Sequence, residues 1–317
     1  MENKNLKFLF TEYTGDRDTR AKAAKSIINN AIPTILRSNP RARKGIEAVE
    51  RIVDPPPVPL PDVATSDRGR ITIVVGDVIQ MAAILHANGM KLPPRRRPRI
   101  AILNMASPLR PGGGVLTGAG SQEESICRRT TLYPSLREEF YRLPEIGGVY
   151  TPAVLVFRLD DGNDPAKLDD KKEWFFVDVV TAAMLRLPDV EGEGDAARYA
   201  RDADREAATR KMTAVMRMLK AKGVDKVVLG AWGCGAYGNP VGEIARAWRR
   251  VLLGRVDEDG VQKERGKGKG TADESECWRE MEVVFAIKDK KMTVAFTRAF
   301  GSKLLEYGLP GPYDMEE

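Results

Sequence analysis

Residues 99–124 read RIAILNMASPLRPGGGVLTGAGSQEE, and most of what the sequence predicts about the fold begins with this stretch. Its apolar start at 99–103 predicts a strand, and two carboxylates open a predicted helix at about 122–136. Between them lies the triplet Gly112-Gly113-Gly114, which lacks side chains and so lets backbone N–H groups approach a ligand closely. The stretch therefore predicts a strand, an anion-binding loop and a helix that begins with Gln122-Glu123-Glu124.

Two interpretations of the carboxylates are open at this point. Ser121 and Glu124 match the capping box, in which an N-cap serine and a glutamate three residues later satisfy each other's backbone amides. Glu124 would then bond to the backbone and could not act on a substrate. Alternatively, paired carboxylates beside a bare anion-binding loop suit the cleavage of a glycosidic bond in a phosphate-bearing substrate.

Elsewhere in the chain, apolar strands alternate with helical segments. We predict strands at 70–75, 153–157, 174–180, 226–229 and 281–287, and helices at 79–85, 202–222, 241–253 and 297–307. We also predict one or two helices over 17–52, broken near Asn39-Pro40, and an extended proline-rich linker at 54–61. This order predicts a three-layer α/β/α fold with a mostly parallel mixed sheet and an N-terminal helical extension.

A second glycine loop, Gly233-Cys234-Gly235-Ala236-Tyr237-Gly238, is a literal G-x-G-x-x-G between a predicted strand and a predicted helix. The motif comes too late for a two-half dinucleotide-binding fold, and the acidic residue of that motif would fall in 257–276. That stretch is polar and of low complexity, and we predict a disordered insertion there. A strand, a glycine turn and a helix N-terminus still suit a diphosphate. Because ligands of parallel sheets bind at the carboxyl ends of strands, we expect both glycine loops at one edge.

Composition narrows the chemistry. Of 317 residues, 42% are hydrophobic and 30% charged, which predicts a soluble protein with a substantial core. There is no apolar run long enough to span a membrane and no signal peptide pattern at the polar start. Three widely separated cysteines indicate a reducing, intracellular compartment. The single histidine, His86, leaves acid–base chemistry to carboxylates, and we expect neither a metal nor a cofactor.

The net charge of +6 weakly favours a polyanionic partner. The basic run at 93–99 fits a nuclear localisation signal, a phosphate-contact patch or a solvated loop. Together with Lys267 and Lys269 it motivates a nucleic-acid-binding hypothesis, which predicts steeply salt-dependent duplex binding. Few aromatic residues lie among these basic residues, so direct nucleic-acid binding ranks last among our hypotheses.

Four blocks of the sequence resemble poly(ADP-ribose) glycohydrolases of the bacterial, macrodomain-only type. The specific ones are 103–133, with its Gly-Gly-Gly, spacer and Gln-Glu-Glu, and 228–239; weaker matches are 150–158 and 283–287. The resemblance covers roughly residues 70–300. It implies a macrodomain-like domain at 69–317 that follows an N-terminal helical extension and linker at 1–68.

The resemblance also implies roles for individual residues. Glu124 would be the catalytic acid and base, while Glu123 and Asn104 would bind ribose hydroxyls. Tyr237 would pack over the ribose and diphosphate where relatives usually carry Phe, and Asp77 would contact adenine unless it is only an Asx turn or helix cap. The remaining substrate-binding residues come from the two loops: Gly112, Gly113, Gly114, Gln122, Gly233, Cys234, Gly235 and Ala236.

Two positions depart from the family pattern. Met105 stands where relatives usually carry an aromatic residue, so the packing behind the first loop is expected to differ. The segment 180–185 lacks the Pro-Asn common in that block, which puts the adenine or distal ribose contacts in doubt.

The implied function is hydrolysis of ribose–ribose O-glycosidic bonds in poly(ADP-ribose), from the chain end, with release of ADP-ribose. The alternatives are a non-catalytic ADP-ribose reader, which has no need of paired glutamates, and a hydrolase of mono-ADP-ribosyl conjugates. The implied partners are poly(ADP-ribose) on modified proteins and the product ADP-ribose, in the reversal of ADP-ribosylation and the DNA damage response. We expect a monomer without membrane contact, in the nucleus or cytoplasm of a eukaryote or the cytoplasm of a bacterium.

Overall fold

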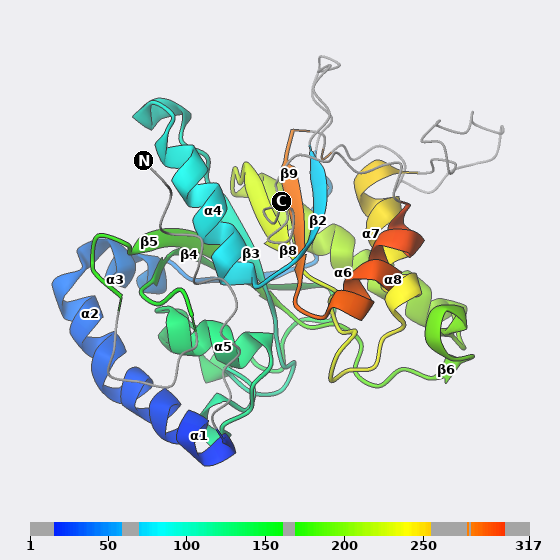
Figure 1. The fold of residues 1–317 in the computed structure, drawn as a ribbon, viewed down its shortest axis with the longest axis horizontal. Helices are drawn as coiled ribbons and strands as arrows, with labels where there is room; N and C mark the ends of the chain where they lie inside the picture. Colours follow the sequence, from blue (N-terminus) through cyan, green and yellow to red (C-terminus); the bar gives the residue numbers. More distant parts are fainter. Residues whose placement is uncertain (1–15, 59–69, 161–168, 255–277, 279, 302–317) are drawn as a thin grey trace, which may run out of the picture.

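The computed structural model describes residues 16–58, 70–160, 169–254, 278 and 280–301 (Figure 1). In these residues a seven-stranded sheet lies between helical layers. Its strands, in spatial order, are β1 (Glu50–Val53), β4 (Gly147–Val156), β5 (Phe175–Ala182), β3 (Ile100–Met105), β8 (Lys226–Leu229), β9 (Glu282–Ile287) and β2 (Ile71–Val75). The five strands from β5 to β2 are parallel, and β4 is antiparallel to both neighbours. The predicted three-layer fold with a mostly parallel mixed sheet is confirmed.

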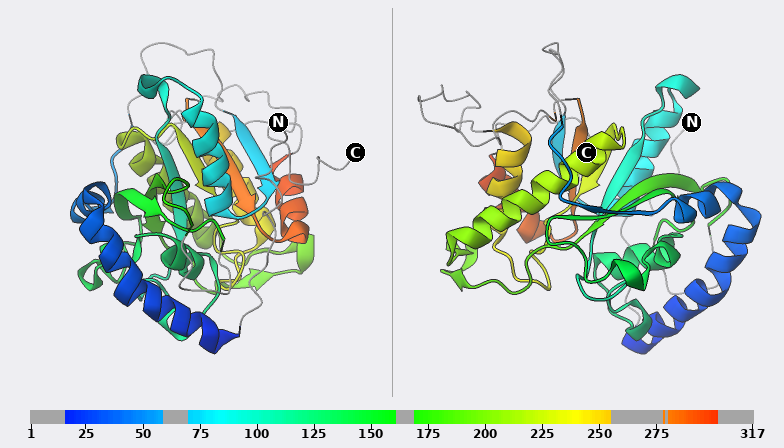
Figure 2. Two further views of the ribbon diagram at one scale, coloured as in Figure 1. Left: turned by 60° about the vertical axis from the view of Figure 1, so that its left-hand side comes forward. Right: turned by 180° about the vertical axis from the view of Figure 1, so that it is seen from behind.

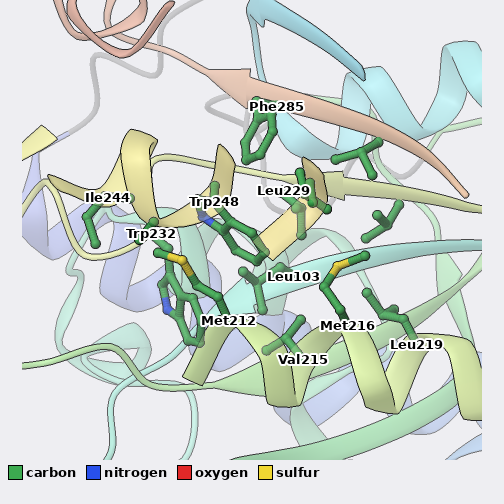
Figure 3. Packing of buried hydrophobic residues seen from close by; sticks show 14 of the residues in the cluster. Leu103, Met212, Val215, Met216, Leu219, Leu229, Trp232, Ile244, Trp248 and Phe285 are labelled. Atoms are coloured by element: carbon green, nitrogen blue, oxygen red, sulfur yellow. The ribbon is translucent and has the colours of Figure 1, made fainter. Parts of the chain in front are cut away.

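The two faces of the sheet bury different helices, because successive side chains of a strand point to opposite faces. Leu103 belongs to the core formed with α6 (Asp202–Ala221), α7 (Val241–Leu253) and α8 (Lys290–Phe300). Figure 3 shows Leu103 among Met212, Val215 and Trp248. Ile102, the next residue, belongs to the core with α4 (Val78–Met90) and α5 (Gln122–Arg129). The sheet is thus buried on both sides, as the continuous apolar strands predict.

The shorter elements join these layers. A two-stranded antiparallel ribbon and a set of 3-10 turns occupy the connections. They are β6 (Val190–Glu191), β7 (Arg198–Tyr199), η2 (Pro94–Arg96), η3 (Val115–Thr117), η4 (Tyr133–Ser135), η5 (Glu138–Phe140) and η6 (Gly194–Ala196). No helix in the described ranges has both the length and the apolar character needed to cross a membrane.

The N-terminal part forms α1 (Arg17–Ser26), a π-helical turn η1 (Ile27–Ala31), α2 (Ile32–Ser38) and α3 (Pro40–Glu47). The predicted break is confirmed at Asn39, whose extended backbone (φ −124°, ψ 92°) is the conformation favoured before proline. The prediction of helix as far as residue 52 is wrong, because 50–53 form the edge strand β1 and pair with β4. The segment before residue 69 is therefore tied to the main sheet, while the domain boundary itself stays a prediction.

Two other predicted helices have different limits. The helix expected over 122–136 ends at Arg129, because Thr130 is extended (φ −141°, ψ 167°) and forms a β-bridge with Val156. The last helix begins at Lys290 rather than 297, where the side chain of Asp289 accepts a hydrogen bond from Met292 N–H and caps it. The predicted insertion at 257–276, residues 302–307 of the predicted closing helix and the end of the proline-rich linker lie outside the described residues.

Candidate active site

The carboxylates of Glu123 and Glu124 lie in the first turn of α5, next to the first glycine loop. Both side chains are buried, with relative exposures of 3% and 5%. Ser121 is the N-cap of the helix, with extended backbone (φ −76°, ψ −177°). A helix N-terminus carries partial positive charge and so favours carboxylates in its first turn. The local sequence thus places two carboxylates where the partial positive charge of the helix N-terminus stabilises their negative charge.

The side chain of Glu124 is held by two donors from the loop. The N–H of Gly114 donates to Oε1 at 2.8 Å, and the hydroxyl of Ser121 donates to Oε2 at 2.6 Å. The Ser121 side chain makes no capping hydrogen bond to the helix backbone. The capping-box interpretation is therefore wrong in this structure, and Glu124 faces the glycine loop instead of folding back on its own helix.

Glu123 has a different environment. Its Oε2 accepts the Ser107 N–H at 2.7 Å, and its buried Oε1 has no hydrogen-bond partner among the described residues. Burial raises the pKa of Glu123 to about 8, and the negative charge of Glu124 adds to the rise. Hydrogen bonding from the Ser107 amide, the Asn104 side chain and the Gly112 amide opposes it. Glu123 consequently keeps its proton at neutral pH.

Gly113 explains why the loop between strand and helix needs glycine. Its φ of +58° is in the left-handed region that side chains disfavour. A Cβ there would lie 2.6 Å from Oε1 of Glu124 and 2.8 Å from Oε2 of Glu123. The residue therefore makes room for both carboxylates. In this structure the N–H of Gly113 donates to Arg110 O and that of Gly114 to Glu124, so the contact of this loop with a diphosphate stays a prediction.

Asn104 and Gln122 join the end of β3 to the site in different ways. Asn104 is fully buried; its Nδ2 donates to Thr181 Oγ1 at 3.3 Å, and its Oδ1 is without a partner in the described part of the chain. Gln122 uses both ends of its amide on the strand, accepting from Met105 N–H at 2.8 Å and donating to Leu103 O at 2.7 Å. Gln122 thus fixes α5 to β3, and the substrate contact assigned to it stays a prediction.

The second glycine loop connects β8 to α7 and is organised by Asn239. The Asn239 side chain is buried, donates to Leu185 O at 2.8 Å and Gly233 O at 3.1 Å, and accepts from the Tyr199 hydroxyl at 2.8 Å. Gly233 has a φ of +82°, and a Cβ there would lie 2.5 Å from Asn239 Nδ2. Among the described residues, no hydrogen-bond acceptor is recorded for the consecutive N–H groups of residues 235–237. These groups are available to an anion.

The two glycine loops meet at Tyr237. Burial raises the pKa of the Tyr237 phenol, a hydrogen bond with the Ser107 side chain opposes the rise, and the negative charge of Glu123 adds to it. The Tyr237 phenol therefore lies close to the Ser107 side chain and within electrostatic range of both glutamates, although these residues are far apart in the sequence. The expectation that both loops lie at one edge of the sheet agrees with this geometry. Cys234, in the same loop, has its thiol pKa raised to about 12 by burial, so it stays protonated.

Asp77 lies at the carboxyl end of β2 and is committed to structural contacts. Its Oδ1 accepts from the N–H groups of Ile79 and Gln80, which caps α4, and from Arg129 Nη1 at 2.8 Å. Lys288 Nζ lies 3.0 Å from its Oδ2. Burial would raise the pKa of Asp77, but the charges of Arg129 and Lys288 outweigh it and lower the pKa to about 2. The helix-cap alternative is present in the structure, and the adenine contact stays a prediction.

Sequence reasoning missed two residues that organise the site. Ser107 donates its N–H to Glu123, accepts from the N–H groups of Leu109 and Arg110 through Oγ, and contacts Tyr237. Asn239 holds the second loop, as described above. Ser-Pro at 107–108 and Asn-Pro at 239–240 are turn-forming pairs that could have drawn attention to both positions. No group of three or more metal-ligating side chains comes together within the residues that the structure describes.

The fold and the site together define a three-layer α/β domain with a carboxylate pair set against a glycine loop at the carboxyl edge of its sheet. Comparison with protein families gives a more particular similarity. Residues 41–159 match the model described as "Microbial-type PARG, catalytic domain", where PARG is poly(ADP-ribose) glycohydrolase. This segment contains β3, the first glycine loop and both glutamates. The resemblance to the bacterial-type PARG is confirmed.

Solved structures agree with the family model. A PARG structure from Thermomonospora curvata is 23% identical, with a TM-score of 0.61, and the match covers 90% of this chain and 100% of that one. A PARG structure from Deinococcus radiodurans in complex with ADP-ribose is 25% identical, with a TM-score of 0.52, covering 75% of this chain and 86% of that one. A comparison with curated protein sequences found no match.

Proposed function

We propose that the protein hydrolyses the ribose–ribose O-glycosidic bonds of poly(ADP-ribose) from the chain end and releases ADP-ribose. The observation that carries the proposal is the geometry of Glu124, a buried carboxylate held by Gly114 N–H and Ser121 hydroxyl beside the protonated Glu123. The family match over 41–159 supports it. The Deinococcus radiodurans structure in complex with ADP-ribose supports the same ligand for this site.

Glu124 would act as general acid and then as general base. Its protonated carboxyl gives a proton to the departing ribose oxygen while the glycosidic C–O bond breaks, which leaves an oxocarbenium-like ribose. The resulting carboxylate then removes a proton from water, whose oxygen bonds to the anomeric carbon. One water is consumed, and Glu124 ends with its proton restored. The donors from Gly114 and Ser121 stabilise the carboxylate between these two steps.

The unpartnered atoms suit the terminal ribose. Asn104 Oδ1 and Glu123 Oε1 are buried and lack partners among the described residues, so each leaves a hydrogen-bonding position for a ribose hydroxyl. Because Glu123 keeps its proton at neutral pH, its carboxyl can both donate to and accept from such hydroxyls. These contacts would hold the anomeric carbon in line with Glu124.

The second loop would hold the diphosphate. Its N–H groups at 235–237 come shortly before the N-terminus of α7 in the chain, and N–H groups together with a helix N-terminus favour phosphate oxygens. Tyr237 would cover the ribose next to that diphosphate, because its phenol interacts with the Ser107 side chain and with the charge of Glu123. Gly233, Cys234, Gly235 and Ala236 would surround the same group, and the space beside Gly235 is open, since a Cβ there would meet nothing within 4 Å.

The test is incubation with poly(ADP-ribosyl)ated protein, comparing wild type with Glu124→Gln and following both polymer length and free ADP-ribose. We expect the wild type to shorten the polymer and release ADP-ribose, while the variant binds ADP-ribose but does not turn over. Intact polymer with wild type, together with ADP-ribose binding, would make the protein a reader. If ADP-ribose is released only from mono-ADP-ribosylated protein, the enzyme is a hydrolase of mono-ADP-ribosyl conjugates.

A further inference from the structure

We propose that helix α1 positions the loop that orients Glu124, with Arg17 and Arg20 as the positioning residues. The catalytic consequence rests on the proposed function. The loop in question is residues 114–121, between the glycine triplet and α5. In Figures 1 and 2, α1 runs along the outside of the molecule next to α5 and the chain that precedes it.

Two arginines of α1 bind successive carbonyls of this loop. Arg17 Nε donates to Thr117 O at 2.9 Å, and Arg20 Nε donates to Gly118 O at 2.8 Å. The two arginines are three positions apart, so they lie on one face of the helix. Thr117 and Gly118 end the 3-10 turn η3, where carbonyls have no partner within the turn. The arginines of α1 supply those partners from about 100 residues earlier in the chain.

Gly118 lets the backbones touch. Its φ of +78° is left-handed, and a Cβ there would lie 1.9 Å from Arg17 O. Gly120 is less restricted: a Cβ there would lie 3.6 Å from Arg20 Nε, an ordinary van der Waals contact. The glycine at 118 is thus explained by the docking of α1, because a side chain there would force the helix away from the loop.

The apolar side of α1 is anchored as well. Ala24 is fully buried and belongs to the core that contains Val115, Ile126 and Cys127. Val115 lies in the loop, and the other two lie in α5. Helix α1 is therefore fixed by apolar packing near its C-terminal end and by charged hydrogen bonds near its start.

The two hydrogen-bond donors to Glu124 come from the first and the last residue of the loop that α1 contacts. Gly114 N–H begins it and the Ser121 hydroxyl ends it. Between them Arg17 and Arg20 fix Thr117 and Gly118, while Arg128 Nη1 donates to Ala119 O at 3.0 Å. Without the two α1 contacts, the donors are free to shift relative to the carboxylate. Misplacement on the order of 1 Å in a catalytic arrangement costs up to about 100-fold in rate.

The experiment compares the full chain as wild type, the double variant Arg17→Ala/Arg20→Ala, Gly118→Ala and the control Lys25→Ala. Lys25 lies on the same helix, is exposed and carries the same charge. Amide hydrogen exchange of residues 114–121 reports on the loop, and steady-state kinetics with poly(ADP-ribose) report on catalysis. We expect faster exchange in this loop and a kcat about tenfold lower for the double variant and Gly118→Ala, with KM within about twofold. Lys25→Ala should match the wild type, and Arg17→Lys/Arg20→Lys should recover part of kcat.

The two readouts test the positioning of the loop and its effect on catalysis separately. Unchanged exchange at 114–121 in the double variant would remove the positioning role, even if the wild type proves inactive on every ADP-ribosyl substrate. Faster exchange with unchanged kcat, or a change confined to KM, would remove the catalytic consequence. The double variant is informative even if Gly118→Ala does not fold, because Arg17 is exposed and Arg20 only partly buried.

Discussion

The side chains of Ser121 and Glu124 are hydrogen-bonded to each other, with the Ser121 hydroxyl 2.6 Å from Glu124 Oε2. A capping box would instead direct each side chain to the other's backbone N–H. The serine that begins α5 therefore orients a carboxylate and does not cap the helix with its side chain. The same two residues would have the same spacing under either arrangement, so only the geometry distinguishes them.

Ser121→Ala removes one of the two donors to Glu124. We expect kcat on poly(ADP-ribose) to fall about tenfold, equivalent to about 1.4 kcal/mol in the barrier, because the carboxylate loses a hydrogen bond to its charged form. The melting temperature should change little, since no capping hydrogen bond is lost. A loss of stability of about 1 kcal/mol with unchanged kcat would restore the capping role.

Gly113→Ala places a methyl group against both glutamates. We expect a stability loss of about 1–3 kcal/mol from the left-handed backbone and the contacts, and kcat reduced at least tenfold because both carboxylates must move. Gly235→Ala is the matched control for stability, because its φ is not positive and its Cβ position is open. Denaturant unfolding of both variants gives the stability comparison, and kinetics on Gly113→Ala measure the loss of activity. Equal stability of the two variants would show that the glutamates do not occupy the space beside Gly113.

Glu123→Gln tests the protonated carboxyl. Because the pKa of Glu123 is raised to about 8 in the folded protein, the folded state holds a proton that the unfolded chain releases near pH 4.5. Stability from this group is therefore fully present below pH 4.5 and declines as the pH rises to about 8. Glutamine resembles the protonated form, so the variant should match the wild type near pH 5 and exceed it by a few kcal/mol near pH 9. Melting curves at both pH values measure this, and a constant difference between the proteins would contradict the raised pKa.

Asp77→Asn leaves Arg129 buried without its carboxylate. We expect a loss of about 3 kcal/mol at neutral pH, because a buried charge loses its partner. Since the pKa of Asp77 is lowered to about 2, the stability it contributes is present above pH 4 and lost as the pH falls toward 2. Denaturant unfolding at pH 7 and pH 2.5 should show the difference between variant and wild type shrinking at the lower pH. A difference that is the same at both pH values would exclude the ion pair as its source.

The sequence predicts the central strands of the sheet well, because they are continuous apolar runs, and an exposed element would not consist of such a run. It predicts β1 wrongly, because Glu50–Val53 is an edge strand whose side chains are mostly exposed and show no alternation. Its partner, Val149, is also about 100 residues away, and periodicity contains no information on pairing at that distance. The end of α5 at Thr130 depends in the same way on a bridge to Val156.

For the candidate site, the sequence predicts which chain segments contribute to it, but not the contacts between those segments. Glu123, Glu124 and the glycine triplet are adjacent in sequence, so their proximity needed no tertiary information. Which donor holds each carboxylate was not predictable, since Ser107 reaches Glu123 only after β3 and α5 have packed together. The contact of Asp77 with Arg129 likewise joins α4 to α5 across 52 positions, which explains why the helix-cap alternative could not be decided from Gly-Asp alone.

The position of β3 has a consequence for how the protein loses activity. This strand is the fourth of seven in the sheet, its first five residues are buried, and it leads directly into the loop that receives the carboxylates. Central strands of this kind separate from their neighbours only when the whole domain unfolds. In a urea titration, β3 should therefore separate from its neighbours at the midpoint reported by tryptophan fluorescence, and any inactivation before that midpoint should come with faster amide exchange in the loop 114–121. The strand that leads into the site is as durable as the domain itself, and the loop held by α1 is the part of the site that can open first.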